Sequence, residues 1–303
     1  MHEKISFNGW PNCLRLWNDK IDVVVATDIG PRILRYGFLG EQNMLHLRAA
    51  DAGRTGGSDW RIYGGHRLWL APEHLPGSYY PDNGPVAFTI SDRSVKIIQS
   101  MEQTSGIVKE MEITIGASGP EITIVHRITN KSASSLSVSP WAITVLAPEG
   151  IAILPQEPFG EEDDFLLPSR GLVLWQYTQM NDPRWEWGNE YILARQNKRI
   201  KSAQKIGILN KQGWAAYSLH EQLFIKQFAY TSGQLYPDFN SNNELYFNDE
   251  FLEIESLAPT TTLVPEEAAE HLETWTLLRT LPDADMAVIT EKISQLFPPV
   301  PAT

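Results

Sequence analysis

The chain has a single cysteine, a deficit of basic residues and no long hydrophobic run. Cys13 is alone among 303 residues, which excludes an intramolecular disulfide and a cysteine-rich zinc site. Lys and Arg total 25 against 37 Asp and Glu, a formal net charge of −12. This balance argues against binding to nucleic acid or to an anionic membrane surface, since both recruit clustered basic residues.

The sequence also lacks the signals of secretion and membrane insertion. No stretch reaches the roughly 18 uninterrupted apolar residues that can cross a bilayer. The first ten residues, MHEKISFNGW, lack the apolar core of a signal peptide. We therefore expect a soluble, cytoplasmic protein that binds neither nucleic acid nor membranes, and nothing in the sequence indicates a cofactor or a metal site.

Helical periodicity is nearly absent. One segment, 283–297, has a helical stripe of Met286, Ile289, Ile293 and Leu296, with Asp283 placed to cap it. The prolines at 298 and 299 predict its end. The stripe is most simply interpreted as packing against a core.

Alternation with a period of two dominates the rest of the chain. Met111, Ile113 and Ile115 alternate with polar residues, and Ile122 and Ile124 begin a second such run. Similar short runs occur at 21–26, 94–100, 171–177, 223–230 and 272–278. Turn residues separate them, and 42% of the sequence is hydrophobic, enough for a large core. We predict an all-β fold: a single large antiparallel β-sandwich over 1–303 with one short C-terminal helix.

The segment 242–256, NNELYFNDEFLEIES, predicts a hairpin that turns at 248–250. Because side chains alternate along a strand, Glu244, Glu253 and Glu255 share one face, with Glu244 opposite Glu253 or Glu255. Opposed like charges are destabilising. The face is therefore either bathed in water or part of a polar cleft, where crowding raises the pKa of a carboxyl group for acid–base chemistry.

The segment 60–74, WRIYGGHRLWLAPEH, interleaves aromatic and polar side chains around a Gly-Gly turn. Trp69 offers a face on which the C–H groups of a sugar ring can stack, and Arg61, Arg67 and His74 offer hydrogen bonds to hydroxyls. The alternative is a structural aromatic cluster with arginines on the surface.

Two further residues have structural and functional interpretations. Lys226 lies in an otherwise apolar strand, where a lysine usually protects a sheet edge or extends toward solvent. His126 shares a face with isoleucines and is interpreted mainly as a core histidine.

The acidic run 161–164 is interpreted as a solvated loop. Motifs for phosphate loops, dinucleotide binding, HExxH zinc sites and GxSxG hydrolases are absent.

Several ordered segments together resemble the galactose mutarotase-like superfamily, in particular its uncharacterised branch related to aldose epimerases. They are IGPRILRYGF (29–38), GGHRLWLAPE (64–73), SPWAITVLAPEG (139–150), YPDFNSNNELYF (236–247), FLEIESLAP (251–259) and HLETWTL (271–277). The resemblance covers about residues 15 to 280 and implies a large β-sandwich with a carbohydrate site on a concave sheet.

The resemblance also implies roles for individual residues. Glu255 best matches the late glutamate that acts as general base in the active mutarotases, and Glu253 is second. The early site motif falls on Gly65, His66 and Arg67. The mid-chain catalytic histidine has no counterpart, because that region reads SPWAITV. His66, His74 or His126 would then have to supply the acid, or the reaction is lost.

Two hypotheses follow for the function. The first is an aldose 1-epimerase-like isomerase with Glu255 as base and His66 or His74 as acid. The second is a non-catalytic carbohydrate-binding module. Substrate-binding candidates are Arg61, Arg67, Trp69, Trp141, Lys226, Asp238, Glu244 and Glu253. The expected partner is a small carbohydrate; an acidic or phosphorylated sugar is one form of this hypothesis, since Arg61, Arg67 and Lys226 could meet an anion.

Overall fold

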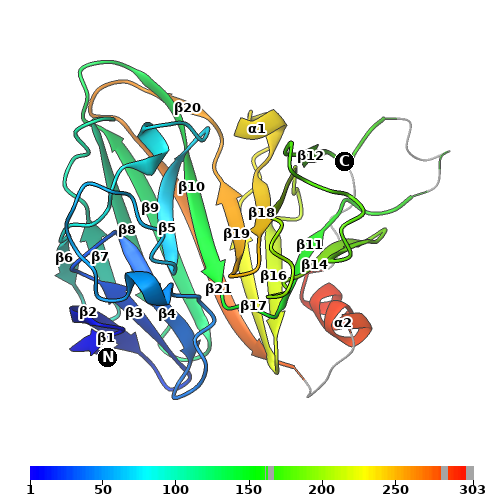
Figure 1. The fold of residues 1–303 in the computed structure, drawn as a ribbon, viewed down its shortest axis with the longest axis horizontal. Helices are drawn as coiled ribbons and strands as arrows, with labels where there is room; N and C mark the ends of the chain where they lie inside the picture. The colour runs from blue at the N-terminus through cyan, green and yellow to red at the C-terminus, as the bar shows by residue number, and fades with distance from the viewer. Residues whose placement is uncertain (161, 163–166, 281–285, 298–303) are drawn as a thin grey trace.

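Two large antiparallel sheets stack face to face in the computed structural model, which describes residues 1–160, 162, 167–280 and 286–297. Figure 1 shows the two sheets side by side with a helix outside the second. The predicted all-β sandwich and its C-terminal helix are confirmed. The acidic run 161–164 and the capping residue Asp283 fall wholly or partly outside the described residues.

The first sheet has 11 strands and carries the site described below. Its order is β1 (His2–Phe7), β2 (Trp10–Trp17), β3 (Ile21–Ala26), β4 (Arg32–Phe38), β5 (His66–Ala71), β10 (Leu136–Leu146), β19 (Leu252–Leu257), β18 (Asn243–Phe247), β15 (Gln204–Ile208) and β12 (Leu172–Leu174), while β20 (Thr261–Leu263) pairs with one end of β10.

The second sheet has ten strands. Its order is β13 (Trp185–Trp187), β14 (Tyr191–Arg195), β11 (Ile151–Pro155), β16 (Trp214–Leu219), β17 (Gln222–Phe228), β21 (Ala268–Arg279), β9 (Glu121–Asn130), β8 (Ile107–Ile115), β7 (Ser94–Ile98) and β6 (Ala87–Ile90).

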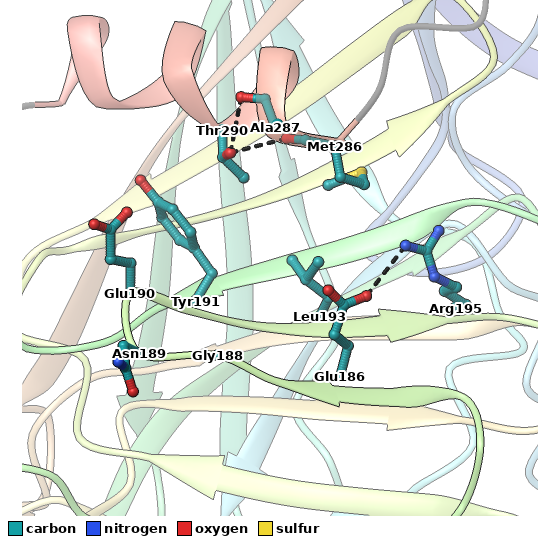
Figure 2. Close-up of a pocket in the computed structure, with 10 residues that line it drawn as sticks. All are labelled: Glu186, Gly188, Asn189, Glu190, Tyr191, Leu193, Arg195, Met286, Ala287 and Thr290. Atoms are coloured by element: carbon teal, nitrogen blue, oxygen red, sulfur yellow. Dashed lines mark hydrogen bonds and ion pairs between the residues drawn. The ribbon is translucent and has the colours of Figure 1, made fainter.

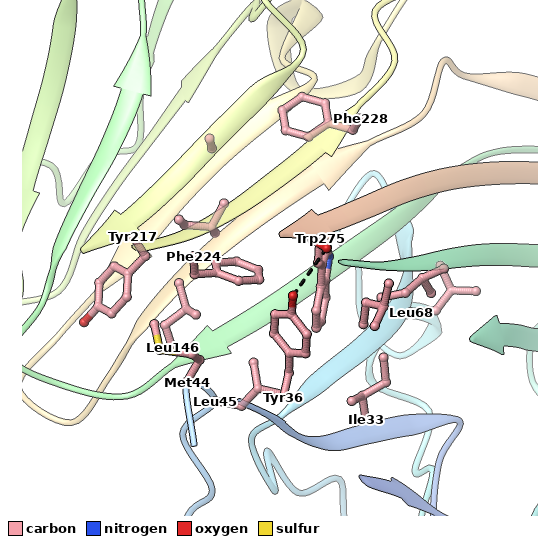
Figure 3. Packing of buried hydrophobic residues seen from close by; sticks show 14 of the residues in the cluster. Ile33, Tyr36, Met44, Leu45, Leu68, Leu146, Tyr217, Phe224, Phe228 and Trp275 are labelled. Atoms are coloured by element: carbon pink, nitrogen blue, oxygen red, sulfur yellow. Dashed lines mark hydrogen bonds between the residues drawn. The ribbon is translucent and has the colours of Figure 1, made fainter. Parts of the chain in front are cut away.

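Alternation in the sequence sets which side chains enter the space between the sheets. In β8 and β9, Met111, Ile113, Ile122 and Ile124 are buried, whereas the residues between them are half-buried or exposed. Figure 3 shows the resulting interior, where Tyr36, Phe224 and Trp275 pack edge to face or tilted. The Tyr36 hydroxyl donates to the Trp275 carbonyl oxygen at 3.3 Å, so the ring links the two sheets.

The C-terminal helix α2 (Met286–Leu296) packs on the outer face of the second sheet. Ile289 and Ile293 are buried there against strands β11, β14, β16 and β17. Leu296, the last residue of the predicted stripe, is instead exposed. In the described part of the chain, no helix is both long and apolar enough to span a bilayer.

The Gly64-Gly65 turn lets the chain enter β5 at a crowded point. Both residues have left-handed φ angles, +87° and +73°. A Cβ on Gly65 would lie 2.2 Å from the carbonyl oxygen of Ile33, and one on Gly64 equally close to that of His46. Only glycine fits both the conformation and the space, and the turn sets the register that aims Arg67 and Trp69 outward.

Candidate functional site

The carboxylate face of the hairpin is the centre of the candidate site. Strands β18 and β19 pair Glu244 with Glu255 and Tyr246 with Glu253, which confirms the predicted shared face and settles the partner of Glu244. All three glutamates are buried; Glu255 is 1% exposed. The face therefore forms a polar cleft and is not bathed in water.

Five neighbouring strands present their outward side chains to this cleft. The order β5, β10, β19, β18, β15 places Arg67, Ile143, Glu255 and Glu244 in one row across the sheet. Each strand turns its alternate residues, such as Leu68 and Ile254, into the core. The site thus lies on the face of the first sheet that points away from the second.

A cavity of about 410 Å³ opens over this face. Its walls are largely aromatic, with carboxylates and two basic groups among them. The lining residues are Trp60, Ile62, Arg67, Trp69, Glu73, Tyr79, Trp141, Ile143, Trp175, Tyr177, Lys205, Tyr246, Phe251, Glu253 and Glu255. Trp69 packs edge-on against Trp60 and Trp141, with ring centroids 5.5 and 5.4 Å apart. Apolar walls with a few convergent polar groups are typical of a small-molecule site.

Glu255 is held by two donors from other strands of the sheet, Trp141 on β10 and Lys205 on β15. Its Oε2 accepts a hydrogen bond from Trp141 Nε1 at 2.8 Å and lies 3.1 Å from Lys205 Nζ. Lys205 Nζ also lies 2.8 Å from Glu244 Oε2 and stands over the rings of Trp141 and Trp175. Burial lowers the pKa of Lys205, but Glu255 and Glu244 outweigh it and raise that pKa well above its usual value. Lys205 is therefore a permanent cation that fixes the Glu255 carboxylate.

Glu253 occupies a different environment two residues away on the same strand. Arg67 Nη1 donates to its Oε1 at 3.0 Å, and the Arg67 guanidinium stands over Trp69. Burial, opposed by Arg67, raises the pKa of Glu253. The two carboxyl groups of one cavity thus have distinct partners: Glu255 contacts the Lys205 ammonium and the Trp141 indole, and Glu253 contacts the Arg67 guanidinium.

Glu244, directly opposite Glu255 on the neighbouring strand, also interacts with Asp238. Asp238 lies in the short segment α1 (Pro237–Asn240), where Asp238, Phe239 and Asn240 all have left-handed φ angles. Burial raises the pKa of both carboxyl groups. For Glu244, the Lys205 ammonium lowers the pKa, but burial and the negative charges of Glu255 and Asp238 raise it by more. We interpret the two carboxyls as sharing a proton, because three carboxylates around one lysine would leave uncompensated buried charge.

A second polar cluster lies between the sheets and contains residues that the sequence had assigned to the site. Lys226 Nζ lies 2.9 Å from Glu273 Oε1 and donates to Thr144 Oγ1 and to the carbonyl oxygens of Ala142 and Ile254. Both charged side chains have no exposed surface. The interpretation of Lys226 as an edge or solvent-reaching lysine is therefore wrong, because its ammonium is satisfied inside the core.

The histidines of this interior cluster fit one set of neutral tautomers. His126 Nδ1 donates to the His271 carbonyl oxygen at 3.0 Å, so His126 Nε2 accepts from His66 Nε2 at 2.7 Å. His66 Nδ1 then accepts from the Thr144 hydroxyl at 3.0 Å. Burial lowers the pKa of His66 well below its usual value and that of His126 to about 4. This confirms the core interpretation of His126 and places His66 beside it.

We tested whether His66, His126 and Glu273 could hold a metal ion, since their ligand atoms lie within 4.8 Å of one another. Two imidazole nitrogens on a tetrahedral zinc stand about 3.3 Å apart, given bonds of about 2.0–2.1 Å, whereas these stand 2.7 Å apart. Both Glu273 oxygens already accept hydrogen bonds, from Ser256 and Trp275. Together with the Lys226 ammonium beside the carboxylate, this geometry fits a hydrogen-bond network better than a cation site.

The structure brings together some of the predicted site residues and separates others. Those lining the cavity are Glu255, Glu253, Arg67, Trp69 and Trp141. Glu244 lies opposite Glu255 and interacts with Asp238, but neither is a lining residue. His66 and Lys226 lie in the core. Neither Arg61 nor His74 lines the cavity: Arg61 donates to Gly56 and Tyr63, and His74 is exposed beside Pro72.

Sequence reasoning missed Lys205. Its one signal is a lysine within the apolar strand QKIGI, the same signal that Lys226 gives. Alternate residues of a strand point to opposite faces of the sheet, so the two lysines can be told apart only when it is known which face is the core and which is the cavity. Trp175 and Tyr177, from the segment after β12, were also missed as cavity residues.

Another cavity, of about 520 Å³, lies between the β13–β14 hairpin and α2 (Figure 2). Glu186 and Arg195 form an ion pair across 3.3 Å at one side, and the Thr290 hydroxyl turns back to the carbonyl oxygens of its own helix. These groups are exposed or already paired, and no cluster of buried carboxylates faces this space among the described residues. The cavity on the first sheet is therefore the stronger candidate.

No family model matches this sequence, and no curated protein matches it either. Solved structures do share its fold. A candidate aldose 1-epimerase from Klebsiella pneumoniae superposes with a TM-score of 0.60 at 13% identity, over 99% of this chain and 88% of that one. The Slr1438 protein from Synechocystis superposes with a TM-score of 0.57 at 12% identity, over 91% of this chain and 99% of that one. A galactose mutarotase-like protein from Lactobacillus casei superposes with a TM-score of 0.53 at 12% identity, over 88% of this chain and 100% of that one. The fold is mutarotase-like, as the sequence resemblance implied.

Proposed function

We propose that the cavity on the first sheet binds an aldose in its ring form and interconverts the two anomers. The observation that carries the proposal is the pair Glu253 and Glu255, two differently held carboxyl groups in one aromatic cavity. The names of the structural neighbours support it, since they include galactose mutarotase-like and aldose 1-epimerase proteins at low identity.

The cavity offers the contacts that a polyhydroxylated ring needs. Trp60, Trp69 and Trp141 line it with aromatic surface against which the C–H side of the ring can pack. Trp60 Nε1 and Arg67 Nε are buried donors without a hydrogen-bond partner in the described part of the chain. Buried donors are rarely left unpaired, so hydroxyl oxygens of a bound sugar would satisfy them.

Glu255 would act as the base. Interconversion begins when a base takes the proton from the anomeric hydroxyl while an acid protonates the ring oxygen and the bond between the anomeric carbon and that oxygen breaks. The open-chain aldehyde rotates, the acid takes its proton back from the hydroxyl, the ring recloses and the base returns the first proton. Lys205 and Trp141 contact Glu255 Oε2 and orient the carboxyl group for the first step.

Glu253 would act as the acid. The Lys205 ammonium is stabilised by two carboxylates, and an arginine does not release its proton. Burial raises the pKa of Glu253, which favours the protonated form that an acid needs. In this proposal Glu253 takes the role that the sequence had assigned to His66 or His74.

Non-catalytic sugar binding is the second candidate function. It is favoured by the absence of a histidine among the described residues that line the cavity. The same aromatic faces and buried donors would then hold a sugar without opening its ring.

Two-dimensional exchange NMR on aldoses, combined with saturation-transfer difference, separates the candidates. We expect anomer exchange faster than in buffer, lost in Glu255→Gln and reduced at least about a hundredfold in Glu253→Gln, within the usual range for acid–base groups. Glu112→Gln, on an exposed position of β8, is the matched control. Saturation transfer without accelerated exchange would favour the binding module, and an unchanged rate in Glu255→Gln would refute the proposed base.

A further inference from the structure

The basic groups of the cavity are already matched by acids. Arg67 is paired with Glu253, and Lys205 with Glu255 and Glu244. The two other basic residues that suggested an anionic ligand do not reach the cavity: Arg61 donates to Gly56 and Tyr63, and Lys226 is in the core. A phosphate or carboxylate on the sugar would therefore have to compete with a glutamate for either cation of the described lining.

One acid of the lining has no basic partner. Glu73 is exposed at the cavity wall, follows β5, and accepts a hydrogen bond from the Tyr79 hydroxyl. Burial, with Glu73 as a further cause, raises the pKa of Tyr79 to about 12, so this phenol stays protonated as the donor. None of the ion pairs between described residues includes Glu73. Of the three glutamates in the described lining, Glu73 is thus the one without a basic side chain beside its carboxyl group.

Aromatic faces surround that charge. The rings of Tyr79 and Trp60 lie 5.2 Å apart at their centroids, and Trp69 packs against both. The negative face of an aromatic ring attracts cations within about 6 Å. Arg67 and Lys205 already use the faces of Trp69, Trp141 and Trp175 in this way. In the described part of the chain, no such cation contact involves Trp60 or Tyr79.

We infer that the ligand of this cavity is an amino sugar, with its ammonium group between the Glu73 carboxylate and the rings of Trp60 and Tyr79. This inference rests on the proposed function and names its substrate class. A sugar that fills the cavity covers Glu73 and removes water from it. A neutral hydroxyl would leave that charge uncompensated, a phosphate would add a second negative charge, and an ammonium would replace the lost water with a charge-assisted hydrogen bond.

The test compares sugars that differ at one substituent. Dissociation constants are measured at near-neutral pH and low salt by calorimetry, with saturation transfer for weak ligands. The probes are D-glucose and D-galactose, their 2-amino and 6-amino derivatives, N-acetyl-D-glucosamine and D-glucose 6-phosphate. We expect at least one amino sugar to bind about tenfold or more tightly than its hydroxyl parent and than an N-acetyl or phosphorylated form. Added salt should reduce this preference.

Variants identify the group that responds to the amine. Glu73→Gln keeps an acceptor for Tyr79 and should abolish the preference for the amine, measured as the ratio of the dissociation constants of the parent and the amino sugar. Glu112→Gln removes the same charge from the other sheet and should keep the preference. Equal affinity for amino and parent sugars, tighter binding of the phosphate, or a preference that survives Glu73→Gln would overturn the inference and leave the proposed function standing. Failure of every sugar to bind would overturn both.

Discussion

The Lys226 ammonium and the Glu273 carboxylate form an ion pair at 2.9 Å with no exposed surface on either side chain. Burial raises the pKa of Glu273, but Lys226 and His271 outweigh it and hold that pKa well below its usual value. Both residues come from the second sheet, on the adjacent strands β17 and β21, and the Lys226 ammonium also reaches across the sandwich to carbonyl oxygens of β10 and β19. These two strands carry Trp141 and Glu255 on their other face, so the pair fixes the site from behind.

Removing the cation should therefore destabilise the fold. We expect Lys226→Met to lower the free energy of unfolding by about 3–5 kcal/mol, because it leaves a buried carboxylate uncompensated. Adding Glu273→Gln removes the buried charge and should recover part of the lost stability. The amide oxygen can still accept from Trp275, and the amide NH2 group can donate to the Ser256 hydroxyl. Urea unfolding measures both, and Lys96→Met, in a partly exposed pair, should cost about 1 kcal/mol or less. Strict additivity of the two core substitutions would contradict this account.

The raised pKa of Glu244 predicts that Glu244→Gln stabilises the protein at neutral pH. Burial makes the folded state hold a proton on this carboxyl that the unfolded state releases at a lower pH. The favourable contribution is complete below the unfolded pKa and is lost as pH rises toward the folded pKa. The variant should therefore match the wild type near the ordinary glutamate pKa and become relatively more stable as pH rises. Urea unfolding across this range checks it; a difference independent of pH would count against a shared proton.

His126 predicts the opposite slope in acid. Burial lowers its folded pKa from 6.5 to about 4, so the neutral ring stabilises the fold above the unfolded value. As pH falls from 6.5 to about 4, this group alone should lower the free energy of unfolding by about 1.4 kcal/mol per pH unit. His126→Asn should be less stable at neutral pH and show a shallower slope over that window. His2→Gln, at an exposed position, should leave the slope unchanged.

Gly65 offers a prediction with a control at the same backbone angle. Gly65→Ala places a methyl group 2.2 Å from the Ile33 carbonyl oxygen at φ +73°, whereas Gly40→Ala has the same φ and open space around it. Gly40→Ala should cost only the left-handed strain, about 1 kcal/mol, and Gly65→Ala about 3 kcal/mol or more, since backbone must also move. Thermal unfolding compares the two, and equal losses would show that β5 absorbs the methyl group.

The alternation of apolar residues in the sequence determined the strands, the sandwich and the shared face of Glu244, Glu253 and Glu255. A period of two fixes which side chains lie together along one strand, and either register of the turn at 248–250 puts the three glutamates on one face. The pairing of Glu244 with Glu255 came only from the structure. The resemblance to mutarotase-like proteins pointed to the same fold and to Glu255.

Only the tertiary structure decided which face of each strand is the site and which is the core. Arg67 and His66 are neighbours in sequence, yet one enters the cavity and the other the interior beside His126. Lys205 and Lys226 look alike in sequence, and the first holds Glu255 while the second is buried with Glu273. The order of strands in the sheets brings these residues together across long separations in the chain, and local periodicity contains no information about that order.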